Sequence, residues 1–140
     1  MQSPTSRIVQ SSFAELAPLA PQMGRIFYAE LFALDPTLRT LFVGNIERQG
    51  DKLVQMIGAA VNLLDQPRRL MPVLRQLGQR HVGYGVRRSH YDVVGLALVR
   101  TLELTLGNRF TDEVRAAWIK FYRLVATTMM AAADELADAA

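Results

Sequence analysis

The two histidines are the residues of this sequence whose chemistry is most informative. His81 and His90 are the only histidines among the 140 residues, and the sequence has no cysteine. A neutral imidazole can bind a metal ion, whereas the lack of thiols excludes disulfides, thiol nucleophiles and zinc–cysteine sites. A single histidine on a helix is more often structural than metal-binding, so the neighbouring residues must decide its role.

Sequence motifs for several other chemistries are missing. The sequence contains no His-Glu-x-x-His, no Glu-x-x-His pair, no glycine-rich phosphate loop and no nucleophile elbow. These arrangements position the metal, the base or the nucleophile in hydrolases and phosphoryl-transfer enzymes. Their absence argues against both classes of reaction.

Composition predicts a single globular domain over residues 1–140. Half of the residues are hydrophobic, 21% are charged, and the formal net charge is +3. A chain of this length can bury a core without help. No apolar run is long enough to span a membrane, and the start of the chain lacks the apolar segment of a signal peptide, so we expect cytoplasmic residence.

The basic residues are almost all arginines, and several gather in one segment. This arginine segment contains Arg68, Arg69, Arg75, Arg80, Arg87 and Arg88. It admits two interpretations, a solvated face or a docking patch for an acidic protein such as a reductase. Because no nucleic-acid-binding motif accompanies it, the segment does not predict binding to nucleic acids.

Hydrophobic periodicity and capping residues predict an all-α fold. Ser3, Asn45 and Thr111 are candidate N-caps, and Ser89 with Asp92 reads as a capping box. We expect helices from Pro4 to about Leu16, Pro21 to Leu34, a short one from Asp35 through Phe42, Asn45 to Leu64, Arg68 to Val82, Ser89 to Leu106 and Thr111 to Leu136. A loop is expected over residues 43–45.

The apolar residues of the last two helices indicate how the helices pack. The helix from Ser89 is apolar nearly all round, so we expect other helices to surround it. The last helix has a single apolar stripe that contains Val114, Trp118, Phe121, Val125 and Met129. Several short helices around one buried helix favour crossed packing over an up-down bundle.

The segment around His81 resembles a known family. It reads Leu77-Gly-Gln-Arg-His81-Val-Gly-Tyr-Gly-Val86 and is followed by His90-Tyr91. In this it is similar to bacterial globins, and more narrowly to single-domain globins and the heme domain of flavohemoglobins. The resemblance extends from about Ile8 to Met130. It implies a globin fold of six to eight helices around a pocket for a non-covalent heme b.

The resemblance also implies roles for individual residues. His81 matches the proximal iron ligand, and Phe42 matches a phenylalanine that stacks on the heme. On the opposite, distal side, Tyr28 and Gln49 match hydrogen-bond donors to the bound ligand, and Leu53 lies on the same helix face as Gln49. Gln49 precedes His81 by 81 − 49 = 32 residues, the separation that this family leads us to expect.

A second set of residues is implied to contact the heme. Lys52, Arg80 and Tyr84 are candidates near the propionates, and Lys52 could equally be a surface lysine. The remaining contacts are Leu77, Val86 and Tyr91. A register with Lys52 opposite the iron is disfavoured, because Gly24 and Gly50 then no longer meet where the second and the distal helix must cross closely.

The sequence departs from the flavohemoglobin pattern at one position. Tyr91 matches a tyrosine that links the proximal histidine to a glutamate on the last helix. Counted from Trp118, that glutamate position falls on Ala133, while Glu135 lies on a different helix face. We therefore expect weaker peroxidase-like activation than the complete set of histidine, tyrosine and glutamate would give.

The resemblance implies ligand binding as the function. We expect reversible binding of O2, and of CO and NO, for oxygen transport or scavenging. The alternative is an NO dioxygenase, which would need a separate reductase because the sequence ends at Ala140 without flavin or nicotinamide domains. A helical interaction module without heme is a third possibility.

Overall fold

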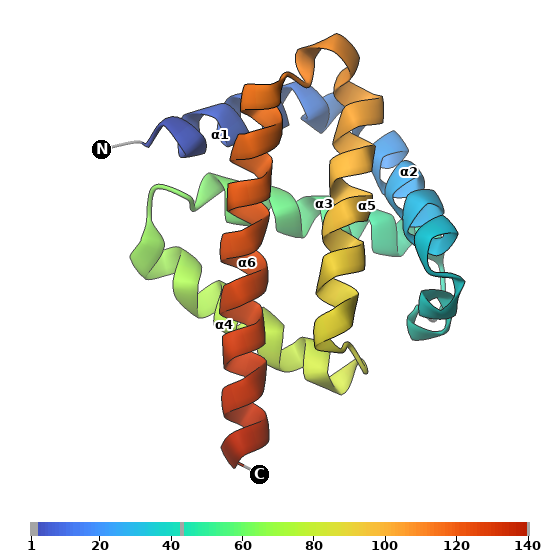
Figure 1. The fold of residues 1–140 in the computed structure, drawn as a ribbon, viewed down its shortest axis with the longest axis vertical. Coiled ribbons are helices and arrows are strands. Elements are labelled where there is room, and N and C mark those ends of the chain that lie inside the picture. The colour runs from blue at the N-terminus through green and yellow to red at the C-terminus, as the bar shows by residue number, and fades with distance from the viewer. Residues whose placement is uncertain (1–2, 43, 140) are drawn as a thin grey trace.

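The computed structural model describes residues 3–42 and 44–139 and is entirely helical over that range apart from its turns and loops. Val43 of the expected loop, Met1, Gln2 and Ala140 lie outside the described residues. The helices are α1 (Pro4–Leu16), α2 (Ala20–Leu34), α3 (Ile46–Asn62), α4 (Pro67–Gly83), α5 (Arg88–Leu106) and α6 (Asp112–Ala139), with 3-10 turns at Ala17–Leu19, Pro36–Leu41 and Gly107–Arg109. In Figure 1, α5 and α6 stand side by side, and α3 and α4 run across them. The predicted all-α class is confirmed.

Three of the predicted caps are confirmed, each by a side-chain oxygen that accepts from a backbone N–H three residues later. The donor nitrogens lie 3.1 Å from Ser3 Oγ, 3.2 Å from Asn45 Oδ1 and 3.2 Å from Thr111 Oγ1. Each bond satisfies one of the amides that a helix start leaves without a partner. These caps explain why α1, α3 and α6 start where the sequence predicts.

The capping box expected at Ser89 and Asp92 is wrong. Helix α5 starts at Arg88, and the backbone N–H of Arg87 donates to Nδ1 of His90 at 2.9 Å. The imidazole of His90 therefore plays the capping role that was expected of the Asp92 carboxylate. The preceding turn sets this start, because Gly85 has a positive φ of 85° that a residue with a side chain rarely adopts.

The expectation that helices surround α5 is also wrong. Leu96 and Leu104 on its outer face are 58% and 63% exposed. The opposite face, which includes Ala97, Leu98 and Leu102, is buried, and α5 packs there on α2 and α6. The apolar residues on the outer face of α5 therefore remain in contact with water.

The core is centred on Trp118 of α6. Its side chain is fully buried, and its indole Nε1–H donates to Ser12 Oγ of α1 at 2.8 Å, so the one polar atom of the ring has a partner. The Phe13 and Phe121 rings lie 6.4 and 5.5 Å from the Trp118 ring. This contact joins α1 to α6 and confirms that the apolar stripe of the last helix faces the core.

Two glycines allow helices to cross with their backbones in contact. A Cβ atom added to Gly24 of α2 would lie 3.0 Å from Gly50 Cα of α3, so the crossing expected at these two glycines is confirmed. A Cβ atom on Gly78 of α4 would clash with the backbone of Met129 in α6, at 2.7 Å from its Cα. These crossings fix the positions of α2 on α3 and of α4 on α6.

The helices of the described residues include no candidate for a membrane-spanning segment. None of them combines the length and the apolar character that a transmembrane helix requires.

Candidate functional site

An aromatic cluster surrounds Tyr28 on α2. Tyr28 is 5% exposed, and its ring lies 5.1 Å from that of Phe42 and 5.8 Å from that of Phe32. The Phe32 and Phe42 rings are themselves 5.7 Å apart. Aromatic pairs at these separations stabilise one another beyond the area that they bury. The cluster thus places Phe42, just after the 3-10 turn Pro36–Leu41, against α2.

The α2–α3 crossing brings Gln49 to the same region. A Cβ atom on Gly50 would lie 3.6 Å from Cε2 of Tyr28, so the α3 backbone runs along the tyrosine ring. Gln49 directly precedes Gly50 and is half-buried, with its side-chain oxygen shielded from solvent. Leu53, one turn later, is also half-buried and packs on the core. The structure therefore groups Tyr28, Phe42 and the start of α3.

Burial moves the pKa of Tyr28 further above physiological pH. Loss of solvent raises the pKa of its hydroxyl from 10.0 to about 12. The hydroxyl consequently stays protonated at physiological pH and can act as a hydrogen-bond donor.

His81, near the end of α4, is held in one orientation by its own helix. Its Nδ1 lies 2.6 Å from the carbonyl oxygen of Leu77, one turn earlier. Because a carbonyl can only accept, Nδ1 carries the proton in the neutral ring and Nε2 keeps its lone pair. Desolvation lowers the pKa of His81 from 6.5 and outweighs the hydrogen bond to Leu77, which raises it. The side chain is therefore a neutral imidazole whose Nε2 can act as a metal ligand or a hydrogen-bond acceptor.

The turn after His81 lies next to the segment that ends at Phe42. A Cβ atom on Gly85 would lie 3.5 Å from Cδ2 of Leu41, the residue before Phe42. The Tyr84 ring lies 5.5 Å from the His81 ring. The end of α4 and the 3-10 turn Pro36–Leu41 thus border the same region from two sides.

The other residues implied by the resemblance differ in exposure. Leu77 and Val86 are half-buried and pack on the core, as the side chains of a partly apolar pocket wall would. Lys52, Arg80 and Tyr84 are exposed, and the Tyr84 side chain is 60% exposed. Exposure suits groups that meet the polar edge of a cofactor, but it is equally typical of surface residues.

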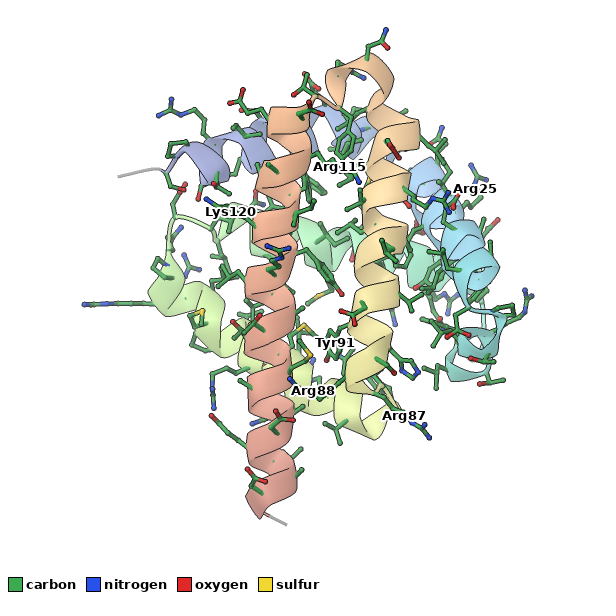
Figure 2. The ribbon with its side chains drawn as sticks, in the orientation of Figure 1. Arg25, Arg87, Arg88, Tyr91, Arg115 and Lys120 are labelled. Atoms are coloured by element: carbon green, nitrogen blue, oxygen red, sulfur yellow. The ribbon has the colours of Figure 1, made fainter. Side chains whose placement is uncertain are left out.

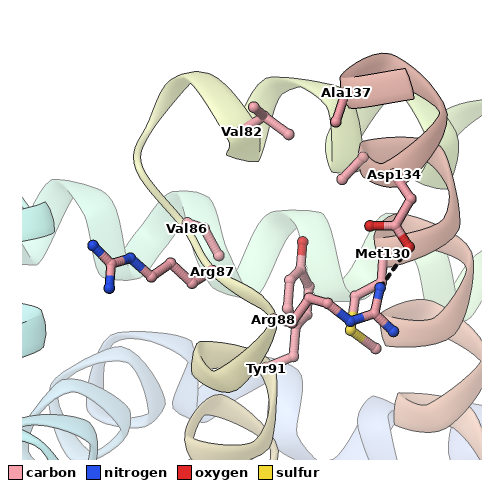
Figure 3. Close-up of a pocket in the computed structure, with 9 residues that line it drawn as sticks. Val82, Val86, Arg87, Arg88, Tyr91, Met130, Asp134 and Ala137 are labelled. Carbon is pink, nitrogen blue, oxygen red and sulfur yellow. Dashed lines mark hydrogen bonds and ion pairs between the residues drawn. The ribbon is translucent and has the colours of Figure 1, made fainter. Parts of the chain in front are cut away.

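Tyr91 is a residue of α5 and lies on the side of that helix that faces α6 (Figure 2). The hydroxyl of Tyr122 on α6 donates to the backbone oxygen of Tyr91 at 2.6 Å. The Tyr91 side chain lines a cavity of about 230 Å³, which Ala133 also lines (Figure 3). Glu135 forms an ion pair with Arg75 of α4. The structure thus offers Tyr91 an alanine where the resemblance implies a glutamate.

The arginine segment is partly paired. Arg75 pairs with Glu135, and Arg88 pairs with Asp134 at 2.6 Å. Both bonds join the end of α6 to its neighbours. The side chains of Arg68, Arg69, Arg80 and Arg87 are exposed. A solvated face and a docking patch both remain compatible with this distribution.

The chemistry of these side chains fits a heme. His81 offers the neutral nitrogen that heme iron accepts as an axial ligand, and Phe42, Leu53, Leu77 and Val86 offer partly buried apolar surface for a porphyrin. Within the described residues, no group of three or more histidine, aspartate or glutamate side chains could hold a metal ion alone. A single histidine suits a metal whose other ligands come from a macrocycle.

Two residues of this region were not predicted from the sequence. Phe32 completes the aromatic cluster, and its place four residues after Tyr28, on the same helix face, was a usable signal. Gly78 makes the α4–α6 crossing, and a glycine inside an otherwise regular helix was the signal for it.

Comparison with known proteins places the chain in a family. The globin family model matches residues 25–129. A flavohemoprotein of Bordetella parapertussis is 31% identical to this chain over 134 residues, or 93% of the chain. A flavohemoprotein of Chromobacterium violaceum is 31% identical over 107 residues, or 74% of the chain. A flavohemoprotein of Bacillus cereus is 27% identical over the whole chain.

The matched region is only a part of these relatives. The chain covers 33%, 26% and 35% of their respective lengths, or roughly a third. The family match nevertheless spans most of this chain and includes Tyr28, Phe42, Gln49 and His81. The helical fold, the close α2–α3 crossing and the oriented imidazole agree with it. The chain therefore belongs to the globin family.

Proposed function

We propose that this globin holds a non-covalent heme b through His81 and binds O2 reversibly on the side of Tyr28. Its family and its flavohemoprotein relatives imply a heme cofactor and a small diatomic ligand. When bound, the heme supplies the iron at which such a ligand binds. The lack of cysteine is compatible with a heme held without covalent attachment.

The observation that carries this proposal is Tyr28, a buried tyrosine whose hydroxyl is protonated and whose ring lies against the start of α3. A heme held here would supply iron at which O2 gains negative charge, and a nearby hydrogen-bond donor such as Tyr28 would stabilise that ligand. A hydrogen bond to a charged acceptor contributes about 1.5–3 kcal/mol. Since about 1.4 kcal/mol corresponds to a factor of ten, such a bond slows O2 release about 10- to 100-fold. Gln49 offers a second donor, its amide NH2 group.

Absorption spectra of the ferric, deoxy and CO forms test the heme assignment. We expect His81→Ala to lose tight heme binding. The control His90→Ala should keep it, because the His90 side chain accepts a hydrogen bond at the start of α5 and is not proposed to bind the heme. Unchanged heme affinity in His81→Ala would contradict the proximal role. A purified chain that stays colourless after addition of hemin would favour the heme-free alternative.

Ligand release tests the distal assignment. Tyr28→Phe removes the hydroxyl and keeps the ring, so it should speed O2 dissociation about 10- to 100-fold. CO is less polar and should leave at nearly the wild-type rate. Equal effects on both ligands in stopped-flow measurements would contradict a hydrogen bond from Tyr28.

A second candidate is NO dioxygenase activity with a separate reductase. The relatives are named flavohemoproteins, a name that implies both a flavin and a heme. A flavin can supply electrons to a heme, which favours a reaction that needs a reductase. Sustained NO consumption with a reductase would support this activity, and a single turnover without recycling would contradict it. The reductase and a cytoplasmic location stay predictions.

A further inference from the structure

The cavity beside Tyr91 exists because α4 and α6 diverge after their contact. The two backbones touch at Gly78 and Met129. One turn further along each helix, Val82 and Ala133 both line the cavity of about 230 Å³. Backbone positions therefore shape this space, and the small side chain of Ala133 leaves it open.

The cavity walls are mainly apolar. Val82, Val86, Met130, Ala133 and Ala137 supply aliphatic and thioether surface from α4, α6 and the turn between α4 and α5. Such walls favour an alkyl group over water, because burying apolar surface stabilises a complex. An occupant with a hydrocarbon portion therefore matches most of the lining.

One hydroxyl enters this apolar space. Figure 3 shows the Tyr91 hydroxyl pointing into the cavity between Val86 and Asp134. No residue in the described part of the chain forms a hydrogen bond with it, since Tyr122 bonds the backbone oxygen of Tyr91 and not the hydroxyl. Burial raises the pKa of Tyr91, so the group stays a donor. An occupant should therefore carry a hydrogen-bond acceptor.

A cation stands at the edge of the cavity. Arg88 donates to Asp134 at 2.6 Å, and the side chains of the pair are 65% and 57% exposed. A guanidinium has five N–H donors, so Arg88 can donate to a second carboxylate while it stays paired with Asp134. The guanidinium of Arg87, by contrast, points away from the cavity (Figure 3).

We propose that this cavity is a binding site for a small monocarboxylate of four to six carbons. Its carboxylate accepts hydrogen bonds from Tyr91 and Arg88, and its alkyl chain packs on Val82, Met130 and Ala133. A small occupant is chosen because the cavity volume is only about 230 Å³. The residues that line the cavity include neither Tyr28 nor His81, although Val86 borders both regions, and the proposal does not rest on the proposed function.

Calorimetric titration of the full chain with sodium hexanoate, at constant ionic strength, tests the proposal. We expect saturable binding of one hexanoate per chain and at least tenfold weaker binding of 1-hexanol, which lacks the charge. No saturable binding, or equal affinity for the alcohol, would overturn the carboxylate assignment. Butyrate should bind more weakly than hexanoate, because it buries less alkyl surface.

Three variants locate the site. Tyr91→Phe and Arg88→Gln should each weaken hexanoate binding about tenfold or more, since each loses a charge-assisted hydrogen bond. Ala133→Leu fills the cavity and should abolish binding. Its control is Ala116→Leu, on an exposed position of the same helix, which should bind as the wild type does. Wild-type affinity in Ala133→Leu, with its helix content confirmed by circular dichroism, would refute the site.

A last measurement separates this site from a bound heme. If the chain is purified with heme, the titration is repeated on the ferrous CO form, in which CO occupies the ligand position. We expect the same hexanoate affinity as before. Loss of binding under CO would place the carboxylate at the heme and overturn the proposal, while leaving the proposed function intact.

Discussion

The molecule has two close helix crossings, and they differ in how the helices pack one turn later. At Gly24 and Gly50, α2 and α3 touch, and the next turn of α2 places the Tyr28 ring against the α3 backbone. At Gly78 and Met129, α4 and α6 touch still more closely, but the next turn opens into the cavity beside Ala133. One turn after the α2–α3 crossing the aromatic rings pack tightly, whereas one turn after the α4–α6 crossing there is a cavity.

The difference shows that contact between helices does not by itself determine what the next turn can do. On the Tyr28 side, the rings of Phe27, Phe32 and Phe42 pack around the Tyr28 ring and restrain it. On the Tyr91 side, the hydroxyl borders open volume and an exposed ion pair. We therefore expect the Tyr28 side to be rigid and the Tyr91 side to accept changes in volume.

The largest effect should come from Gly78→Ala. The new methyl group would meet the Met129 backbone, which cannot move as a flexible side chain does, and overpacking of this severity costs about 3 kcal/mol. Urea unfolding measures the loss of stability.

Gly83→Ala is the matched control for this change. Gly83 lies on the same helix, and in the described residues no atom of another segment comes within 4 Å of an added Cβ. Alanine favours helix over glycine by up to about 1 kcal/mol, so this variant should be neutral or slightly more stable. A similar loss in both variants would mean that the crossing is looser than described.

A smaller loss should follow Gly24→Ala at the other crossing. Its Cβ would lie 3.0 Å from Gly50 Cα, a milder overlap that should cost about 1–2 kcal/mol. The same urea titration measures it. A loss larger than that of Gly78→Ala would reverse the order of the two crossings.

A gain in stability, rather than a loss, is expected at Ala133, one turn after the contact between Gly78 and Met129. Ala133→Leu adds apolar volume to the cavity and should stabilise the protein by about 1 kcal/mol, as cavity-filling substitutions commonly do. Thermal unfolding would detect the gain. A destabilised Ala133→Leu variant would indicate that the cavity cannot accommodate a larger side chain.

The smallest effect concerns pH. Because burial lowers the pKa of His81 from 6.5, the unfolded chain binds more protons than the folded chain as the pH falls through 6.5. The heme-free protein should therefore lose stability on acidification, and His81→Gln should lose less between about pH 7.5 and 5.5. Urea unfolding of both proteins at the two pH values tests this, and parallel losses would contradict a desolvated imidazole.

Local signals predicted the helices, whereas the resemblance to the globin family predicted the crossing. Caps at Ser3, Asn45 and Thr111 and paired glycines at Gly24 and Gly50 are visible in the sequence itself. The α5 start was mispredicted, because Ser89-x-x-Asp92 satisfies the same pattern as a capping box while the turn at Gly85 determines which residue caps the helix.

The cavity and the exposed face of α5 could not be predicted in the same way. Both depend on the angle at which helices cross, which side-chain periodicity does not specify. The apolar pattern of α5 allows burial on every side, yet Leu96 and Leu104 face water because no helix of the described chain covers them. In the same way, Ala133 becomes a cavity wall only because α4 diverges from α6 beyond Gly78.

The bond that orients His81 has a genetic consequence. Its acceptor is the backbone oxygen of Leu77, which every amino acid at position 77 would supply. A substitution at that position can change packing, but it cannot delete the acceptor, whereas an orienting carboxylate would be lost by one codon change. The direction of the imidazole is therefore protected against drift in the surrounding sequence for as long as α4 remains a helix.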